Sequence, residues 1–173
     1  MGLDQVELRL GQLVFLRDQG FAHEGHMVAI FQFVATLAAI LFAGAAVYVS
    51  AVEHPARMEC GTELAATVFG PSYRRGAVLQ VILAITATIA GTATWYLTSS
   101  SVWLGGALLI FALIPYTLLV IMPTNKRLLD TRLDRNSETA HQLLRTWGTL
   151  HAVRSIVGLA ASLIFLSALV WRK

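Results

Sequence analysis

The sequence predicts an all-α integral membrane protein, a four-helix bundle with a short amphipathic N-terminal segment. Three observations predict this fold: 56% of the 173 residues are hydrophobic, only 13% are charged, and the mean hydropathy is +0.65. A chain of this composition needs lipid as part of its solvent. The excess hydrophobicity lies in four apolar runs, at about residues 28–52, 77–98, 101–122 and 152–171. Each run is close to the roughly 20 residues that a helix needs to cross a bilayer core.

Residues 1–27 form the predicted N-terminal segment, and residues 28–173 form the four-span domain. In residues 5–16, apolar and polar side chains follow an imperfect helical pattern, which favours a short surface helix lying on the membrane. The acidic residues of this segment, among them Asp4 and Asp18, are not typical of the basic leader of a secretory signal. We therefore expect the first apolar run to be a true span.

The first span and the connection after it have distinct patterns. Ala35, Ala39 and Ala43 recur at four-residue spacing, and such a stripe of small residues lets a neighbouring helix approach closely. The connection at residues 53–76 is polar and contains the pairs His54-Pro55 and Gly70-Pro71. Because the residue before a proline disfavours helix, these pairs are predicted to end one helix and begin a turn.

The last three spans are predicted to follow one another through one short turn and one longer connection. Only a few residues around Ser99, Ser100 and Ser101 join the second and third apolar runs, so these two spans form a tight antiparallel hairpin. Pro115 is expected to kink the third span and Pro123 to close it. In the connection at residues 124–150, Asn136 or Ser137 is a suitable N-cap for a helix that continues into the fourth span.

The distribution of basic residues predicts an orientation. Four alternating spans place the two long connections on one side and both termini on the other. The connection side carries eight lysines and arginines and the terminal side carries four. By the positive-inside rule, the protein is expected in the cell inner membrane with both termini outside and the two long loops in the cytoplasm. Because these basic residues adjoin apolar spans, we expect them to contact lipid headgroups, and we expect no nucleic-acid partner.

Polar and aromatic side chains gather at the connection end of the predicted bundle. Burying charge in a membrane costs about 2.5–3.5 kcal/mol on insertion scales, so intramembrane ionisable residues are functional candidates. Trp147, His151 and Arg154 are spaced by four and three residues and therefore share one helix face. Together with residues at the ends of the first and third spans, they predict a pocket. The candidate residues are Tyr48, Glu53, His54, Asn125, Trp147, His151 and Arg154.

Each candidate also has a purely structural interpretation. His54 before a proline is compatible with a helix-ending residue, and His151 with a hydrogen-bonded interfacial histidine. Arg154 is compatible with an ion pair to Glu53 or with a side chain that reaches the headgroups. Trp147 alone is typical of an interfacial belt. A metal site formed by His54, His151 and Glu53 is a further alternative. The convergence of all these residues at one bundle end favours a functional pocket.

The residues resemble a known family in four stretches: YVSAVEHPARMECGTELA, FGPSYRRGAVLQ, PYTLLVIMPTNKRLLD and RTWGTLHAVRSIVGLAA. These are similar to the signature segments of the DUF1772 family of small four-helix membrane proteins, whose fungal members include anthrone oxygenases. The resemblance runs from about Gly44 to Ala161. It implies a membrane-embedded, anthrone oxygenase-like monooxygenase that acts on a lipophilic, aromatic compound by proton abstraction and reaction with dioxygen.

The resemblance also implies roles for the candidate residues. An anthrone has an acidic methylene, and the anion left by deprotonation can pass an electron to dioxygen, so neither a flavin nor a metal is obligatory. The reaction needs a base with a pKa near the working pH, which His54 or His151 provides by residue type. Arg154 and Asn125 are then expected to stabilise the oxyanion.

The remaining candidates are expected to bind the substrate. Trp147 and Tyr48 would stack against a flat substrate, with Glu53 beside them. The sequence leaves an alternative open: a non-enzymatic membrane protein for ligand binding, transport or subunit association that uses the same polar pocket. Small lipophilic molecules and the lipid bilayer are partners under both hypotheses, and a homo-oligomer is compatible with either.

Overall fold

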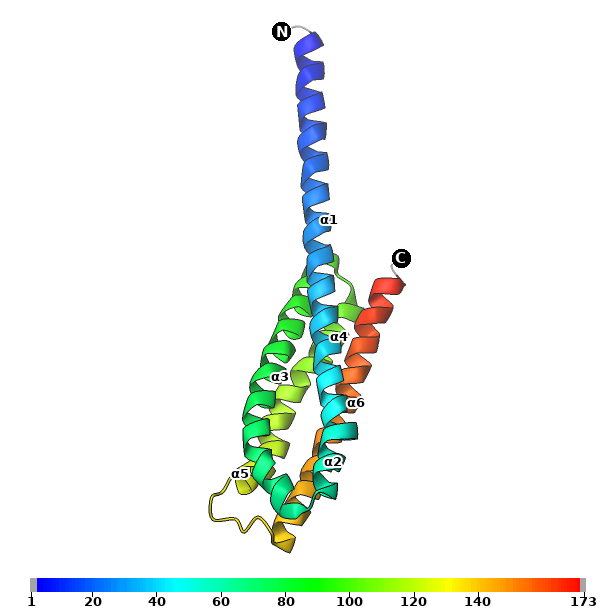
Figure 1. The fold of residues 1–173 in the computed structure, drawn as a ribbon. Helices are drawn as coiled ribbons and strands as arrows, with labels where there is room; N and C mark the ends of the chain where they lie inside the picture. The colour runs from blue at the N-terminus through cyan, green and yellow to red at the C-terminus, as the bar shows by residue number, and fades with distance from the viewer. Residues whose placement is uncertain (1–2, 172–173) are drawn as a thin grey trace.

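The computed structural model describes the backbone of residues 3–171 and the side chains of residues 24–171. This part of the chain is all helical apart from short connections, as predicted (Figure 1). Two turns of π-helix, η1 and η2, interrupt the α-helices. The elements are α1 (Leu3–Tyr48), η1 (Val49–Glu53), α2 (His54–Glu59), α3 (Thr62–Thr98), α4 (Ser101–Tyr116), η2 (Thr117–Ile121), α5 (Met122–Leu128) and α6 (Glu138–Val170).

Four helical stretches are long and apolar enough to cross a membrane, which confirms the predicted number of spans. They are Glu24–Glu59, Thr62–Thr98, Ser101–Leu128 and Glu138–Val170. The protein is therefore an integral membrane protein. Residues 5–16, expected as a separate surface helix, continue without a break into the first span within α1. The side chains of this segment lie outside the described residues, and its position on a membrane stays a prediction.

Small residues bring the four spans close together. Ala35, Ala39 and Ala43 are buried, which confirms the predicted stripe on α1. The ring of Phe165 on α6 packs so closely against α4 that a Cβ added at Gly106 would lie 2.5 Å from it. Real Cβ atoms essentially never approach that closely, so any larger residue at position 106 would force the Phe165 ring to move. The core of the spans therefore depends on alanine and glycine, with Phe165 filling the space that they leave.

Two local predictions from the sequence are confirmed. Helix α3 ends at Thr98 and α4 begins at Ser101, so the serines form the expected tight hairpin, with Ser99 in the left-handed region at φ 56°. Ser137 is the N-cap of α6, and its Oγ accepts a hydrogen bond of 3.2 Å from the backbone N–H of Ala140. Helix α6 then runs without interruption through the candidate residues.

The helix breaks expected at two prolines are wrong. The first span continues past Pro55 to Glu59, and the third continues past Pro123 to Leu128. In both places a π-helical turn precedes the proline. A proline ring clashes with the carbonyl four residues earlier, which here belongs to Ala51 in η1 and to Leu119 in η2. The wider π-turn moves that carbonyl away, so the helix continues.

The predicted polar loop at residues 53–76 is also wrong, because most of it is helix. Only Cys60 and Gly61 separate α2 from α3, with Gly61 at φ 96°, and Gly70-Pro71 lies inside α3. The first turns of α3 are amphipathic: Ala65, Ala66 and Phe69 are buried in a second core cluster that includes Trp147. Packing at this end of the bundle therefore outweighs the local helix-breaking tendency of glycine and proline.

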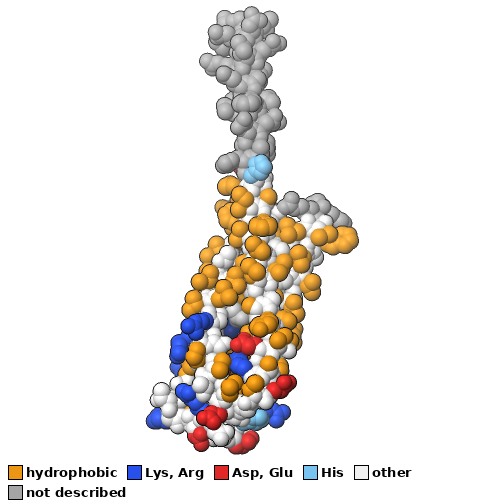
Figure 2. Space-filling view, in the orientation of Figure 1, with side chains coloured by type: hydrophobic (Ala, Val, Ile, Leu, Met, Phe, Trp, Pro, Cys, Tyr) orange, Lys and Arg blue, Asp and Glu red, His pale blue; other side chains and the backbone are white. Residues whose placement is uncertain are grey.

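Among the residues whose side chains are described, the charged ones lie mainly at one end of the bundle. The turn between α2 and α3 and the loop between α5 and α6 share that end, and the serine hairpin is at the other (Figure 1). In Figure 2, lysine, arginine and acidic side chains gather over the end that carries α2 and α5, whereas the rest of the described part of this face is mainly hydrophobic. This arrangement suits spans in lipid with a polar rim in the headgroup region.

Candidate functional site

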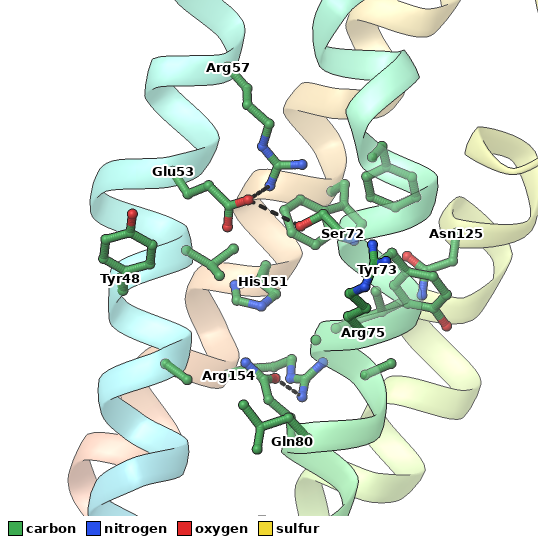
Figure 3. Close-up of a pocket in the computed structure, with 18 residues that line it drawn as sticks. Tyr48, Glu53, Arg57, Ser72, Tyr73, Arg75, Gln80, Asn125, His151 and Arg154 are labelled. Atoms are coloured by element: carbon green, nitrogen blue, oxygen red, sulfur yellow. Dashed lines mark hydrogen bonds and ion pairs between the residues drawn. The ribbon is translucent and has the colours of Figure 1, made fainter.

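A cavity of about 320 Å³ lies within the charged end of the bundle, between α1 with η1, α3, α5 and α6 (Figure 3). This volume is in the range of about 300–1,000 Å³ that is typical of small-molecule sites. The wall is mostly apolar, with polar groups at defined positions. Its polar and aromatic side chains are Tyr48, Glu53, Arg57, Phe69, Ser72, Tyr73, Arg75, Gln80, Asn125, Trp147, His151 and Arg154.

His151 is held in place from two sides. Its side chain is 4% exposed, and its ring stacks on Trp147 with centroids 4.7 Å apart. Ser50 Oγ lies 3.0 Å from His151 Nδ1 and 2.9 Å from Ser155 Oγ, at hydrogen-bonding distance from both. Among the described residues, no hydrogen-bond partner reaches the Nε2 atom. The ring is therefore fixed through one nitrogen, while the other is available to a ligand in the cavity.

Arg154 is a buried cation with a neutral partner. Its guanidinium donates a hydrogen bond to Gln80 Oε1 and lies over the ring of Phe42, 5.5 Å from the centroid. The Arg154 Nε atom is buried, and no described residue supplies it with a hydrogen-bond partner. Within the part of the chain that the structure describes, no carboxylate lies within ion-pair distance of Arg154.

Glu53 pairs with another residue instead. Its Oε1 atom lies 3.5 Å from Arg57 Nη2 and accepts a hydrogen bond of 3.1 Å from Ser72 Oγ (Figure 3). Glu53 on η1 thereby links α2 to α3 at the cavity wall. The ion pair between Glu53 and Arg154, which the sequence left open, is absent among the described residues.

Asn125 carries an unpaired buried amide. The side chain is 1% exposed, and neither Oδ1 nor Nδ2 has a hydrogen-bond partner among the described residues. Leaving a buried polar group unsatisfied costs about 1–3 kcal/mol, so each such group calls for an explanation. Asn125 lines the cavity, and a ligand there that accepts and donates hydrogen bonds would supply the missing partners.

His54 lies near the cavity but does not line it. Its ring packs against Trp147, with centroids 5.2 Å apart, and a Cβ added at Gly148 would lie 2.6 Å from His54 Nε2. Trp147 is buried and also meets Phe69 edge to face at 5.3 Å, so it is not an exposed belt residue. His54 is thus placed where it can orient the Trp147 ring, and His151 stacks on that ring.

The other predicted residues lie around the same cavity. Tyr48 is 58% exposed and stands at the edge, next to Glu53 on the following turn. Among the described residues, no group of three His, Cys, Asp or Glu side chains is placed to hold a metal ion. Six of the seven candidate residues thus line the cavity, and His54 is the exception.

Several residues of this site were not predicted from the sequence. Gln80 is the partner of Arg154, Arg57 is the partner of Glu53, and Ser50 is the partner of His151. Gln80 had a visible signal, since it is a single amide within the apolar run of residues 77–85 and such a group needs a buried partner. Ser50 had none, because a serine in a span commonly bonds its own helix backbone.

Comparison with known proteins gives two matches. The family model described as anthrone oxygenase matches residues 66–164, which include Asn125, His151 and Arg154. The chain is also similar to a protein named anthrone oxygenase from Claviceps purpurea (strain 20.1), at 30% identity over 161 residues, covering 84% of this chain and 89% of that protein. No solved structure matches the chain. Since the family model covers more than half of the sequence, this chain belongs to the anthrone oxygenase family.

Proposed function

We propose that the protein is a membrane-embedded monooxygenase that converts the methylene of a lipophilic, anthrone-like aromatic compound to a carbonyl with dioxygen. The observation that carries the proposal is the convergence of a histidine with an available nitrogen, an unpaired amide and a buried guanidinium on one cavity. The name of the Claviceps relative supports the same reaction class.

The reaction balances without a further reactant: one methylene and one dioxygen give one carbonyl and one water. His151 takes a proton from the methylene through Nε2, and the electron pair of the C–H bond stays on the ring system as an enolate-like anion. This anion transfers an electron to dioxygen, and the two radicals join in a C–O bond. His151 then returns its proton to the peroxide. Loss of the second C–H proton and cleavage of the O–O bond give the carbonyl and water.

Asn125 and Arg154 stabilise the anion in this mechanism. The enolate places negative charge on the ring oxygen, and the Asn125 amide has an unused N–H donor in the cavity wall. Arg154 adds positive charge from a buried position, where electrostatic stabilisation is stronger than in water. Both groups are in place before the reaction, so little reorganisation is needed when the charge forms.

The remaining wall residues position the substrate. Trp147, Phe69 and Tyr73 supply aromatic surface for a flat ring system. Glu53, already held by Arg57 and Ser72, accepts a hydrogen bond from a phenolic hydroxyl. In this assignment His54 acts through Trp147 and is a positioning residue.

The bilayer supplies both reactants. The cavity edge between α1 and α3 includes Tyr48 and Leu79, both exposed on the outer surface of the bundle. An apolar polycyclic compound and dioxygen concentrate in lipid, so we propose that the substrate enters from the membrane through this edge. Water is then largely excluded when the ring system is bound.

Dioxygen uptake tests the proposed function. Purified protein in a neutral detergent is mixed with emodin anthrone in an oxygen-electrode chamber, and quinone formation is followed by absorbance. We expect uptake well above the protein-free autoxidation rate, with one dioxygen consumed for each quinone formed. Heat-unfolded protein is the matched control. Uptake equal to that control would contradict the proposal and favour the ligand-binding alternative.

We also propose that the charged end of the bundle faces the cytoplasm. Cys60 is the single cysteine of the sequence and is exposed in the turn between α2 and α3. We expect a membrane-impermeant maleimide to label Cys60 only after cells are permeabilised. Labelling of Cys60 in intact cells would show the opposite orientation. A Cys60→Ser variant measures the background labelling.

A further inference from the structure

The cavity contains a buried positive charge that no acidic side chain in the described part of the protein balances. Three arginines and one glutamate line it: Arg57, Arg75, Arg154 and Glu53. Arg57 is paired with Glu53, and Arg75 is exposed, so water and lipid headgroups can solvate its charge. Arg154 is 9% exposed, and its hydrogen-bond partner is the neutral amide of Gln80. Isolated buried charge is costly, so Arg154 needs an anion that the described residues do not provide.

Proton transfer within the proposed reaction supplies a negative charge near Arg154 only while the enolate exists, and it leaves the resting cavity without an anion. When His151 deprotonates a neutral substrate, one negative charge appears on the substrate and one positive charge appears on the imidazole. The total charge of the cavity is unchanged, and the new imidazolium lies on the same helix face as Arg154, one turn away. Like charges in a low-dielectric site repel strongly. A bound substrate that already carries a negative charge would offset this repulsion and favour the proton transfer.

We infer that the substrate is an anionic aromatic, a polycyclic compound that carries a carboxylate, and that Arg154 binds this group. This inference rests on the proposed function and names its substrate class. The carboxylate neutralises Arg154 and satisfies the Nε donor that the structure leaves without a partner. It also offsets the imidazolium that forms on His151. The unpaired Asn125 amide in the same cavity is then free for the ring oxygen of the substrate.

Equilibrium binding of two matched probes tests the inference without turnover. Anthraquinone-2-carboxylate and anthraquinone-2-carboxamide share one ring system and differ by one charge. Their binding to the purified protein is measured by quenching of tryptophan fluorescence, since Trp147 lies in the cavity wall. We expect the carboxylate to bind about tenfold or more tightly than the carboxamide, as a charge-assisted hydrogen bond requires. Equal binding, or tighter binding of the carboxamide, would overturn the inference.

Variants at Arg154 assign the preference to this residue. Arg154→Gln is expected to remove the preference, and Arg154→Lys to retain it because the charge is kept. Arg132→Gln makes the same change at an exposed arginine outside the cavity and should leave the preference unchanged. If Arg154→Gln does not fold, the inference is still tested by the Arg154→Lys variant and by the comparison of the two probes on the wild-type protein. A preference that persists in folded Arg154→Gln would refute the assignment.

A lipid phosphate is the other possible source of an anion at Arg154. The same binding assay distinguishes it from a substrate carboxylate. Addition of phosphatidylglycerol to the detergent should not displace the carboxylate probe. Displacement of the probe would show that Arg154 holds a lipid headgroup and would overturn the inference. The outcome is also distinct from that of the proposed function: probe discrimination without dioxygen uptake removes only the oxygenase, and uptake without discrimination removes only the anionic substrate.

Discussion

His151→Gln is expected to lower the rate of dioxygen consumption with an anthrone by about 10²–10⁴-fold, the usual contribution of a general base. Glutamine keeps a polar side chain that can still bond to Ser50, but it cannot accept and return a proton. The loss should appear in kcat at saturating anthrone, because the aromatic walls that bind the substrate remain. The measurement is uptake at varied anthrone concentration, corrected for autoxidation.

Two other histidines serve as controls for this variant. His26 is exposed on α1, far along the chain from the cavity residues, and His26→Gln should retain the wild-type rate. His54→Gln should raise KM more than it lowers kcat, because His54 supports Trp147 and does not line the cavity. If His54→Gln abolished kcat and His151→Gln did not, the assignment of the base would have to be exchanged.

Asn125→Leu is expected to lower kcat by about 10²–10³-fold, as the loss of one oxyanion donor does in other enzymes. The same substitution should raise the thermal unfolding temperature. Both amide atoms of Asn125 are buried without partners, and an apolar side chain of similar size removes that desolvation cost. Opposite changes in activity and stability are the signature of a residue retained for function.

Gln80→Leu provides the contrast for the stability measurement. Gln80 is also a buried amide on the cavity wall, but it is the hydrogen-bond partner of Arg154. Its removal leaves the guanidinium unsatisfied, so this variant should unfold at a lower temperature than the wild type. A fall in unfolding temperature for Asn125→Leu as large as that for Gln80→Leu would contradict the account, since it would make Asn125 a structural residue.

The spans could be predicted from the sequence because hydrophobic runs in a membrane protein are strong, local signals. The structure of the bundle end formed by residues 53–76 and 124–150 could not be predicted, because it depends on packing between distant segments. His54-Pro55 looks like a helix end when read alone. In the structure, the π-turn before Pro55 carries the helix onward. The same spacing, tyrosine followed seven residues later by proline, recurs at Tyr116 and Pro123 around the second π-turn.

The candidate site was predictable in outline and not in its pairing. Helical spacing alone placed Trp147, His151 and Arg154 on one face, and the structure brings all three to the cavity wall. The pairing of these side chains could not be predicted from their spacing, because it depends on how the helices are aligned with one another along the bundle axis. Arg154 forms a hydrogen bond with Gln80 on α3. Glu53 instead forms an ion pair with Arg57, which lies one turn further along the same helical stretch. The roles assigned to these residues stay predictions until the variants are measured.

Isotopic labelling tests the central claim most directly. The wild-type protein is supplied with an anthrone under ¹⁸O₂ in ordinary water, and the quinone is analysed by mass spectrometry. The account predicts one ¹⁸O atom in each quinone formed enzymatically, with the second atom released as water, and it predicts that His151→Gln lowers the formation of this labelled product to near the autoxidation background. An unlabelled quinone accompanied by hydrogen peroxide would contradict the account, because dioxygen would then be only an electron acceptor.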